Sequence, residues 1–391
     1  MERPLLNRSL AGMGTTIFAE MSALASATGS INLGQGFPDT DGPEEIAAAA
    51  AAAIMEGRGN QYPPGPGIPE LRHAVASHQK RFYGLDVDPD TEVLVTAGAT
   101  EAIAAALIAL MEPGDEAIAF EPYYDSYAAC VAMAGGIRVP VTLRPPAFRP
   151  DIDALRAAVT PRTRLILLNS PHNPTGAVFS RAELTEIAAV ACEHDLLVVS
   201  DEVYEHLVFE GVHVPIATLP GMRERTVTIS SAAKTFSFTG WKIGWVTATS
   251  ELVTAVRTVK QFLTYVTGGP FQYAVAQALA LPDSYFASIS ADLRGKRDVL
   301  CPGLAEVGFE VFRPAGTYFV TTDVRHLGHA DGMEFCRELP DRAGVVAIPS
   351  SVFYDDAAAG KTQVRFAFCK KEEVLREAVA RLARLARGSG A

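Results

Sequence analysis

Short apolar runs alternate with longer helical patterns through the middle of the chain. Runs rich in β-branched and aliphatic residues occupy positions 92–96, 117–120, 164–169, 196–201 and 226–230. Strands that are apolar at nearly every position are typical of a parallel sheet buried on both faces. Because helical segments separate these runs, the pattern predicts an α/β fold in which a mostly parallel sheet is sandwiched by helices.

The pattern changes from about residue 283 onward. A long helical segment that carries several charges comes first and runs through residues 293–297. Shorter strand-like runs follow at 309–312, 318–320 and 363–368, before a C-terminal helix. This arrangement predicts a smaller α+β domain after the large one.

The two patterns together predict three parts of the chain. Residues 1–42 form an N-terminal arm that joins the small domain, residues 43–284 form the large domain, and residues 285–391 form the small C-terminal domain. A chain of 391 residues exceeds what one ordinary hydrophobic core organises, which agrees with a division into domains.

Composition narrows the classes of function. Hydrophobic residues make up 48% and charged residues 20% of the chain, as in a well-packed globular protein. The net charge of -11 argues against nucleic acid as a partner, because phosphate backbones need a basic surface. We expect no membrane partner, since no apolar run has the length of a span and the start MERPLLNRSL lacks a secretory core. The five cysteines are scattered and odd in number, so we expect reduced thiols and a cytoplasmic protein.

Polar residues gather where the predicted strands end. In an open parallel sheet, ligands bind outside the carboxyl ends of the strands. The first strand is followed by Gly98, Ala99 and Thr100, which open a helix and offer free backbone N–H groups and a hydroxyl. Such a helix start suits a phosphate group. The third strand is followed by SPHNPTG, in which flanking prolines hold Asn173 in a rigid turn.

The last two strand ends carry an acid and a lysine. Asp201 ends one strand and is followed by Tyr204, whereas Ser231 and Lys234 follow the other. An aldehyde-reactive lysine, an acid for a ring nitrogen and a phosphate cradle together fit pyridoxal 5'-phosphate. In this interpretation Asp201 keeps the ring nitrogen protonated. Lys234 forms the Schiff base and, once the substrate displaces it, moves the proton at the substrate Cα.

The remaining polar residues hold the same cofactor in this interpretation. Tyr204 and Asn173 donate hydrogen bonds to the ring O3′. Lys242 and Ser231 complete the phosphate site with Thr100. We expect no metal ion among the catalytic groups.

Several motifs resemble one enzyme family. They are NLGQGFPD (32–39), NQYPPGPGIPELR (60–72), HNPTG (172–176), DEVY (201–204) and SAAKTFSFTGWKIGW (231–245). They look like those of the fold-type I aminotransferases and occur in the expected order, and the likeness runs over nearly the whole chain. The subgroup that they resemble is that of the kynurenine, glutamine and methionine aminotransferases, with relatives assigned to N-succinyldiaminopimelate.

The resemblance implies roles for further residues. Tyr124 would stack on the pyridine ring, and Tyr62 would reach the phosphate in the neighbouring subunit, so that a homodimer shares its active sites. Arg365 would bind the substrate α-carboxylate as a planar two-pronged donor. The backbone at Gly36 and the asparagine of HNPTG would assist it, and Phe18 would line the pocket.

This chain departs from the family pattern at two places. Lys242 stands where many relatives have arginine, an exchange that keeps the positive charge. In TYVTGGPFQ (264–272), Tyr265 and Val266 replace the Phe-His pair of kynurenine aminotransferases. The second departure weakens the expectation of an aromatic substrate.

The resemblance implies transamination by a ping-pong mechanism. An L-amino acid with a neutral, sulfur-containing or aromatic side chain would give its amino group to a 2-oxo acid. Two alternatives stay open on the same scaffold: the N-succinyldiaminopimelate aminotransferase reaction of lysine biosynthesis, and a C–S β-lyase. A ligand-sensing regulator would need an added DNA-binding segment, for which this acidic chain has neither room nor charge.

Each candidate residue also has a structural alternative. Lys234 could be an ordinary loop lysine, and Arg365 could pair with a structural carboxylate such as Asp323. Tyr62 and Tyr124 could be core aromatics. The structure separates these alternatives through burial and contacts.

Overall fold

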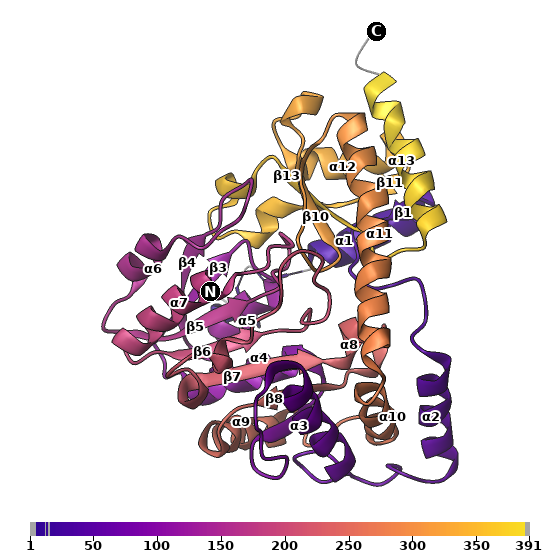
Figure 1. The fold of residues 1–391 in the computed structure, drawn as a ribbon. Coiled ribbons are helices and arrows are strands. Elements are labelled where there is room, and N and C mark those ends of the chain that lie inside the picture. Colours follow the sequence, from indigo (N-terminus) through magenta and orange to yellow (C-terminus); the bar gives the residue numbers. More distant parts are fainter. Residues whose placement is uncertain (1–4, 12, 15, 388–391) are drawn as a thin grey trace.

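The computed structural model describes residues 5–11, 13–14 and 16–387, and a central sheet lies between helices as predicted (Figure 1). Within these residues the main sheet has seven strands: β2 (Val93–Thr96), β8 (Gly244–Thr247), β7 (Thr226–Ser231), β6 (Leu197–Asp201), β5 (Thr163–Asn169), β3 (Glu116–Glu121) and β4 (Ile137–Thr142), in this spatial order. β8 is antiparallel to both neighbours, and the other pairs are parallel. The five predicted strands are confirmed, and β4 and β8 complete the sheet.

Alternate side chains of the central strands enter two separate cores. Leu165 and Leu167 of β5 pack into one core, whereas Ile166 and Leu168 pack into the other. One core lies under α4 (Gly98–Leu110), α5 (Asp125–Met133) and α9 (Ser250–Leu263), and the other under α6 (Ile152–Ala158) and α7 (Arg181–Glu193). Since both faces are covered, both sets of side chains must be apolar, which explains the continuous apolar runs.

A third group of helices covers the β2 edge of the sheet. It consists of α2 (Glu44–Met55), α3 (Pro69–Tyr83) and α10 (Gly269–Leu279). A one-turn helix, α8 (Ala232–Thr235), follows β7 directly. Single 3-10 turns lie at Arg8–Leu10, Ile216–Thr218, Arg223–Arg225, Thr239–Trp241, Arg325–Leu327, Ser350–Phe353 and Ala357–Gly360.

The C-terminal part forms a separate, smaller α+β unit. Its antiparallel sheet has the order β12 (Ile348–Pro349), β13 (Gln363–Ala367), β10 (Phe319–Asp323) and β9 (Glu310–Phe312). Its helices are α11 (Asp283–Val307), α12 (Gly332–Ala343) and α13 (Glu372–Arg387). This confirms the predicted α/β fold with a smaller α+β part.

The N-terminal segment packs with this small unit. α1 (Ile17–Thr28) lies among the C-terminal elements, and β1 (Ile31–Asn32) pairs in parallel with β11 (Val345–Val346) (Figure 1). The boundaries at residues 42 and 284 stay predictions, although α11 begins one residue before the second of them. Across the described part of the chain, no helix combines the length and apolarity that a membrane crossing needs.

Candidate active site

A cavity of about 440 Å³ lies at the carboxyl ends of the central strands, where the large and small units meet. Its lining includes residues of β5, β6, α4 and α8 from the large unit and of β10 and β13 from the small unit. The predicted residues that line it are Phe18, Gly36, Gly98, Ala99, Thr100, Tyr124, Asn173, Asp201, Tyr204, Ser231, Lys234, Lys242 and Arg365. The structure therefore brings all the predicted site residues together except Tyr62.

Lys234 lies in the one-turn helix α8, where the chain leaves the sheet. Its Nζ is 5.9 Å from the ring centroid of Tyr204 and 5.8 Å from that of Tyr318. It forms no hydrogen bond or ion pair with any residue that the structure describes. Burial lowers the pKa of Lys234, and the charge of Asp201 only partly opposes this shift. A buried amine with a lowered pKa is more often unprotonated and can attack an aldehyde.

Asp201 ends β6 and is fixed from two sides. The parallel register aligns it with Asn169 of β5, whose Nδ2 donates a 2.8 Å hydrogen bond to the Asp201 backbone oxygen. Tyr127 of α5 donates a 2.5 Å hydrogen bond to Asp201 Oδ2. Burial raises the pKa of Asp201 to about 6, against the opposing effect of the Tyr127 bond. A cation placed opposite this carboxylate would be strongly stabilised.

Arg365 comes from β13 of the small sheet and is 1% exposed. Its Nη1 donates a 3.0 Å hydrogen bond to Asn173 Oδ1, and its Nη2 donates one of 3.0 Å to the backbone oxygen of Gly34. Its buried Nε has no hydrogen-bond partner among the described residues. Burial lowers the pKa of Arg365 to about 10, so the guanidinium stays charged at neutral pH. A buried cation with a free donor is suited to an anionic ligand group.

One detail differs from the sequence interpretation. Asp323 pairs with Arg325 and not with Arg365, so the structural alternative for the arginine is wrong. The backbone oxygen of Gly36, which lines the cavity, accepts the hydroxyl of Tyr318 at 2.5 Å. The backbone oxygen that contacts the Arg365 guanidinium is that of Gly34, and the role of the Gly36 backbone beside a substrate carboxylate stays a prediction.

The start of α4 forms a narrow cradle beside Lys242. Gly98 has a φ of +76°, and a Cβ placed there would lie 3.2 Å from Lys242 Nζ. Lys242 itself has a φ of +56°, which turns the chain before β8. Thr100 and Ser231 also line this cavity. Backbone N–H groups at a helix start, an ammonium group and two hydroxyl residues fit a phosphate.

The aromatic residues of the site are mostly buried. Tyr204 packs edge-on against Tyr318, with ring centroids 5.4 Å apart, and burial raises its pKa. Tyr124 packs edge-on against Tyr127 at 5.9 Å, and burial raises its pKa to about 12. Both hydroxyls are therefore protonated donors at neutral pH.

Tyr62 lies outside this cavity. Its side chain is 82% exposed and contacts Tyr265, with ring centroids 5.5 Å apart. Tyr62 borders a separate surface hollow that Val266 also lines. The position excludes a core role for Tyr62 and leaves its ring free for contact with another molecule.

Some residues that line the cavity were not predicted from the sequence. They are Thr16, Gln35, Phe37, Asp125, Tyr127 and Phe319. Asp125 and Tyr127 belong to the EPYYDSY segment that contains Tyr124, so the same strand end held the signal. The others come from the N-terminal segment and the small sheet, whose approach to the cavity is a matter of tertiary packing.

The donor set fits pyridoxal 5'-phosphate. A Cβ at Gly98 would crowd the end of the Lys242 side chain, so glycine leaves the helix start and the ammonium group open to a phosphate, and the unpaired amine of Lys234 suits the aldehyde. Asp201 offers a carboxylate for a protonated ring nitrogen.

Comparisons with known proteins agree with this chemistry. The family model for aminotransferases of class I and II matches residues 28–382. A probable N-succinyldiaminopimelate aminotransferase of Mycobacterium tuberculosis is 55% identical over 383 residues, which cover 95% of this chain and 96% of that protein. The methionine aminotransferase of Escherichia coli is 42% identical over 384 residues, or 98% and 99% of the two chains. The solved structure of N-succinyldiaminopimelate aminotransferase from Mycobacterium tuberculosis superposes with a TM-score of 0.95 over 97% of this chain and 100% of that one. The chain belongs to the class I and II aminotransferases, enzymes that use pyridoxal 5'-phosphate.

Proposed function

We propose that the amino donor of this aminotransferase is an N-succinyl-diaminopimelate and that its amino group passes to a 2-oxo acid in a ping-pong cycle. The observation that supports this substrate most strongly is the 55% identity, over almost the full length, to a protein named for it. The structural agreement over 97% of the chain gives further support.

Different residues of the cavity bind the substrate and the cofactor. Arg365 binds the substrate α-carboxylate through its free Nε and its Nη groups, and Asn173 holds the guanidinium in place. Gly98, Thr100 and the residues facing them hold the cofactor phosphate. The cofactor, when bound, supplies a ring that withdraws electrons from the substrate Cα.

Lys234 and Asp201 provide the proton chemistry. The Lys234 amine, freed by the substrate, takes the proton from the substrate Cα and later returns a proton. Its lowered pKa keeps a useful fraction of this amine unprotonated. Asp201 would be the carboxylate opposite the ring nitrogen, and the Tyr204 hydroxyl would donate a hydrogen bond to the ring oxygen.

A neutral amino acid is the second candidate donor. The cavity lining includes Phe18, Phe37 and Phe319, and the cations in it are Lys234, Lys242 and Arg365, all of which already have a proposed role. An apolar wall of this kind suits a side chain such as that of methionine, and the 42% identity to a methionine aminotransferase agrees with this.

A single-turnover screen distinguishes the candidates. Each donor, including N-succinyl-LL-diaminopimelate, methionine, glutamine, kynurenine and glutamate, is mixed with enzyme that carries the aldehyde form of the cofactor. We expect N-succinyl-LL-diaminopimelate to convert the aldehyde band at least ~100-fold faster than the others, a difference of about 2.7 kcal/mol. Faster conversion by methionine would establish the second candidate. Release of pyruvate and ammonia from a cysteine conjugate without an oxo acid would identify a β-lyase.

We further propose a cytoplasmic homodimer in which Tyr62 serves the partner's active site. Tyr62 packs against Tyr265, and both side chains are exposed, as are those of Phe262 and Leu263, which shortly precede Tyr265 in the chain. All five cysteines are free thiols, which agrees with a reducing compartment. Mixing inactive Lys234→Ala chains with weakened Tyr62→Phe chains would test the sharing. Each mixed dimer would contain one site with both residues intact, so activity should recover on mixing. No recovery would place Tyr62 in its own chain's function.

A further inference from the structure

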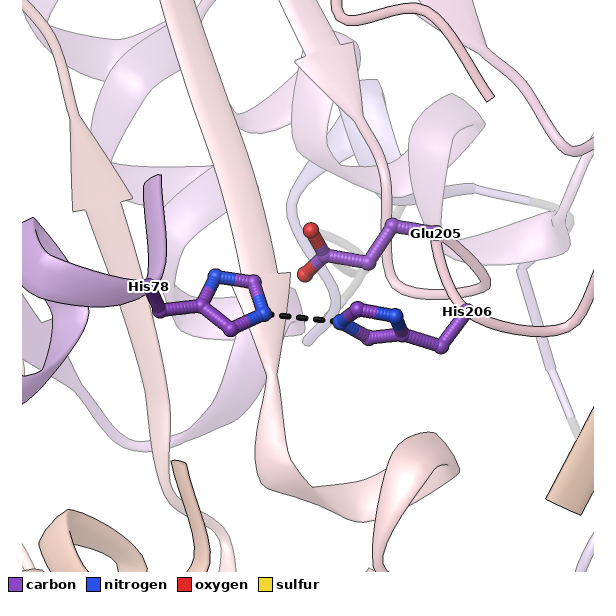
Figure 2. A group of neighbouring side chains, drawn as sticks. All are labelled: His78, Glu205 and His206. Atoms are coloured by element: carbon purple, nitrogen blue, oxygen red, sulfur yellow. Dashed lines mark hydrogen bonds between the residues drawn. The ribbon is translucent and has the colours of Figure 1, made fainter. Parts of the chain in front are cut away.

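A buried cluster of polar side chains lies behind the active-site wall. It joins His78 of α3 to Glu205 and His206, which lie in the turn after β6 (Figure 2). The Nε2 atoms of His78 and His206 are 2.7 Å apart, so one imidazole donates a hydrogen bond to the other. His78 is 1% exposed and Glu205 is 5% exposed.

Glu205 is the centre of this cluster. Its carboxylate accepts a 2.5 Å hydrogen bond from Ser230 Oγ and a 2.6 Å hydrogen bond from the hydroxyl of Tyr83. Burial alone would raise the pKa of Glu205, but the nearby histidines and the two hydroxyl donors outweigh it and hold the pKa below its usual range. The group is therefore a buried carboxylate anchored to two other elements, β7 and α3.

Glu205 and its partner Ser230 are each next in sequence to a residue of the cavity. Glu205 directly follows Tyr204, and Ser230 directly precedes Ser231. A backbone hydrogen bond of 2.8 Å from the N–H of Glu202 to the oxygen of Ile229 is the neighbouring link between the same two segments. The Glu205 carboxylate thus adds a second link between the turn that carries Tyr204 and the strand end that carries Ser231.

The geometry favours a hydrogen-bond network over a metal site. Both Glu205 bonds are short and come from hydroxyl groups that would have to give way to a metal ion. Two imidazole nitrogens bound to one zinc ion lie about 3.3 Å apart, which is the separation of tetrahedral ligands at about 2.0 Å. The observed 2.7 Å is a hydrogen-bond distance.

We propose that Glu205 is a positioning residue that holds Tyr204 and Ser231 in register at the cofactor site through its hydrogen bonds to Ser230 and Tyr83. The inference rests on the cofactor roles proposed above for Tyr204 and Ser231. Glu205 itself is not among the residues that line the cavity. Its effect on the cofactor is exerted through the two backbone segments that it joins.

The test compares Glu205→Leu with Glu205→Gln in the full-length enzyme. Two quantities are measured: the dissociation constant of pyridoxal 5'-phosphate, and the pH midpoint of the absorption band of the lysine-bound cofactor. Leucine removes both hydrogen bonds, so we expect at least 10-fold weaker cofactor binding and a shifted midpoint. Glutamine keeps an acceptor for Ser230 and can accept or donate toward Tyr83, so its dissociation constant should change less than 3-fold.

Glu116→Leu is the matched control. Glu116 is 3% exposed and accepts hydrogen bonds from Thr160 and Arg162 at the start of β3, at the opposite end of the sheet strands from the cavity. This variant should lower the melting temperature without changing the cofactor dissociation constant or the band. If Glu205→Leu does the same and only lowers the melting temperature, Glu205 has a merely structural role and the proposal is wrong.

Two milder variants keep the test decisive if Glu205→Leu does not fold. Ser230→Ala and Tyr83→Phe each remove one of the two donors, and each should weaken cofactor binding about 2- to 5-fold. Unchanged binding in both would overturn the proposal. A wild-type enzyme without a lysine-linked band would instead refute the cofactor roles on which the proposal rests, so the two failures can be told apart.

Discussion

Arg365 and Asn173 meet across the cavity: Nη1 of the arginine donates a 3.0 Å hydrogen bond to Oδ1 of the asparagine, although 192 positions separate the two residues. One comes from the small sheet and the other from a proline-flanked turn of the large unit. The contact fixes the guanidinium while its Nε stays free. The proposed site for the substrate carboxylate therefore lies at the junction of the two units.

Replacing Arg365 by lysine should remove the two-pronged donor and keep the charge. We expect kcat/KM to fall about 100-fold, or about 2.7 kcal/mol, for every amino donor and oxo acid alike. Steady-state kinetics with two donors measures the effect. Arg325→Lys is the control, because Arg325 is an exposed arginine that pairs with Asp323. This variant should change kcat/KM little. An Arg365→Lys enzyme with unchanged kcat/KM would show that the carboxylate binds elsewhere.

Replacing Tyr127 by phenylalanine should raise the pKa of Asp201 above its value of about 6, since the hydroxyl donates to the ionised carboxylate. The acid limb of the pH profile for cofactor affinity should then move upward by about 1 unit. Tyr123→Phe is the control, because that hydroxyl bonds Asp355 instead. Coincident acid limbs for wild type and Tyr127→Phe would mean that this bond does not tune Asp201.

The stability of cofactor-free protein should depend on pH through Asp201. Its pKa in the folded chain, about 6, exceeds the ordinary value of 3.8, so folding favours the neutral form. That contribution is present below about pH 4 and is lost as the pH rises through about 6. Asp201→Asn cannot ionise. At pH 8 the cofactor-free variant should therefore be more stable than wild type by roughly 2–3 kcal/mol, and at pH 4 nearly equal. Chemical unfolding at both pH values measures this, and a difference independent of pH would contradict it.

Gly98→Ala should damage the phosphate cradle. The position has a φ of +76°, and the added methyl group would lie 3.2 Å from Lys242 Nζ. Gly114→Ala is a close control, because it has a φ of +96° and open space around it. Both variants should lose about 1 kcal/mol of stability from backbone strain. Only Gly98→Ala should weaken pyridoxal 5'-phosphate binding, by about 10-fold or more in equilibrium titrations. Equal binding by the two variants would argue against the cradle.

Site residues could be predicted from the sequence where they directly follow a predicted strand. The parallel register that sets Asn169 beside Asp201 follows from the order of the strands, so residues at adjacent strand ends could be expected to meet. Tyr127 was not assigned because its partner lies 74 positions away, on another element. The contact between Arg365 and the backbone of Gly34 depends on how the N-terminal segment lies against the small sheet. No local pattern encodes such packing.

Covalent trapping tests the central claim, which is that Lys234 binds the cofactor. The enzyme loaded with pyridoxal 5'-phosphate is reduced with borohydride, digested, and mapped by mass spectrometry. We expect one phosphopyridoxyl group, on Lys234 within the segment 231–245. Modification of Lys242 or of the buried Lys260 in its place, with Lys234 unmodified, would contradict the assignment of the site.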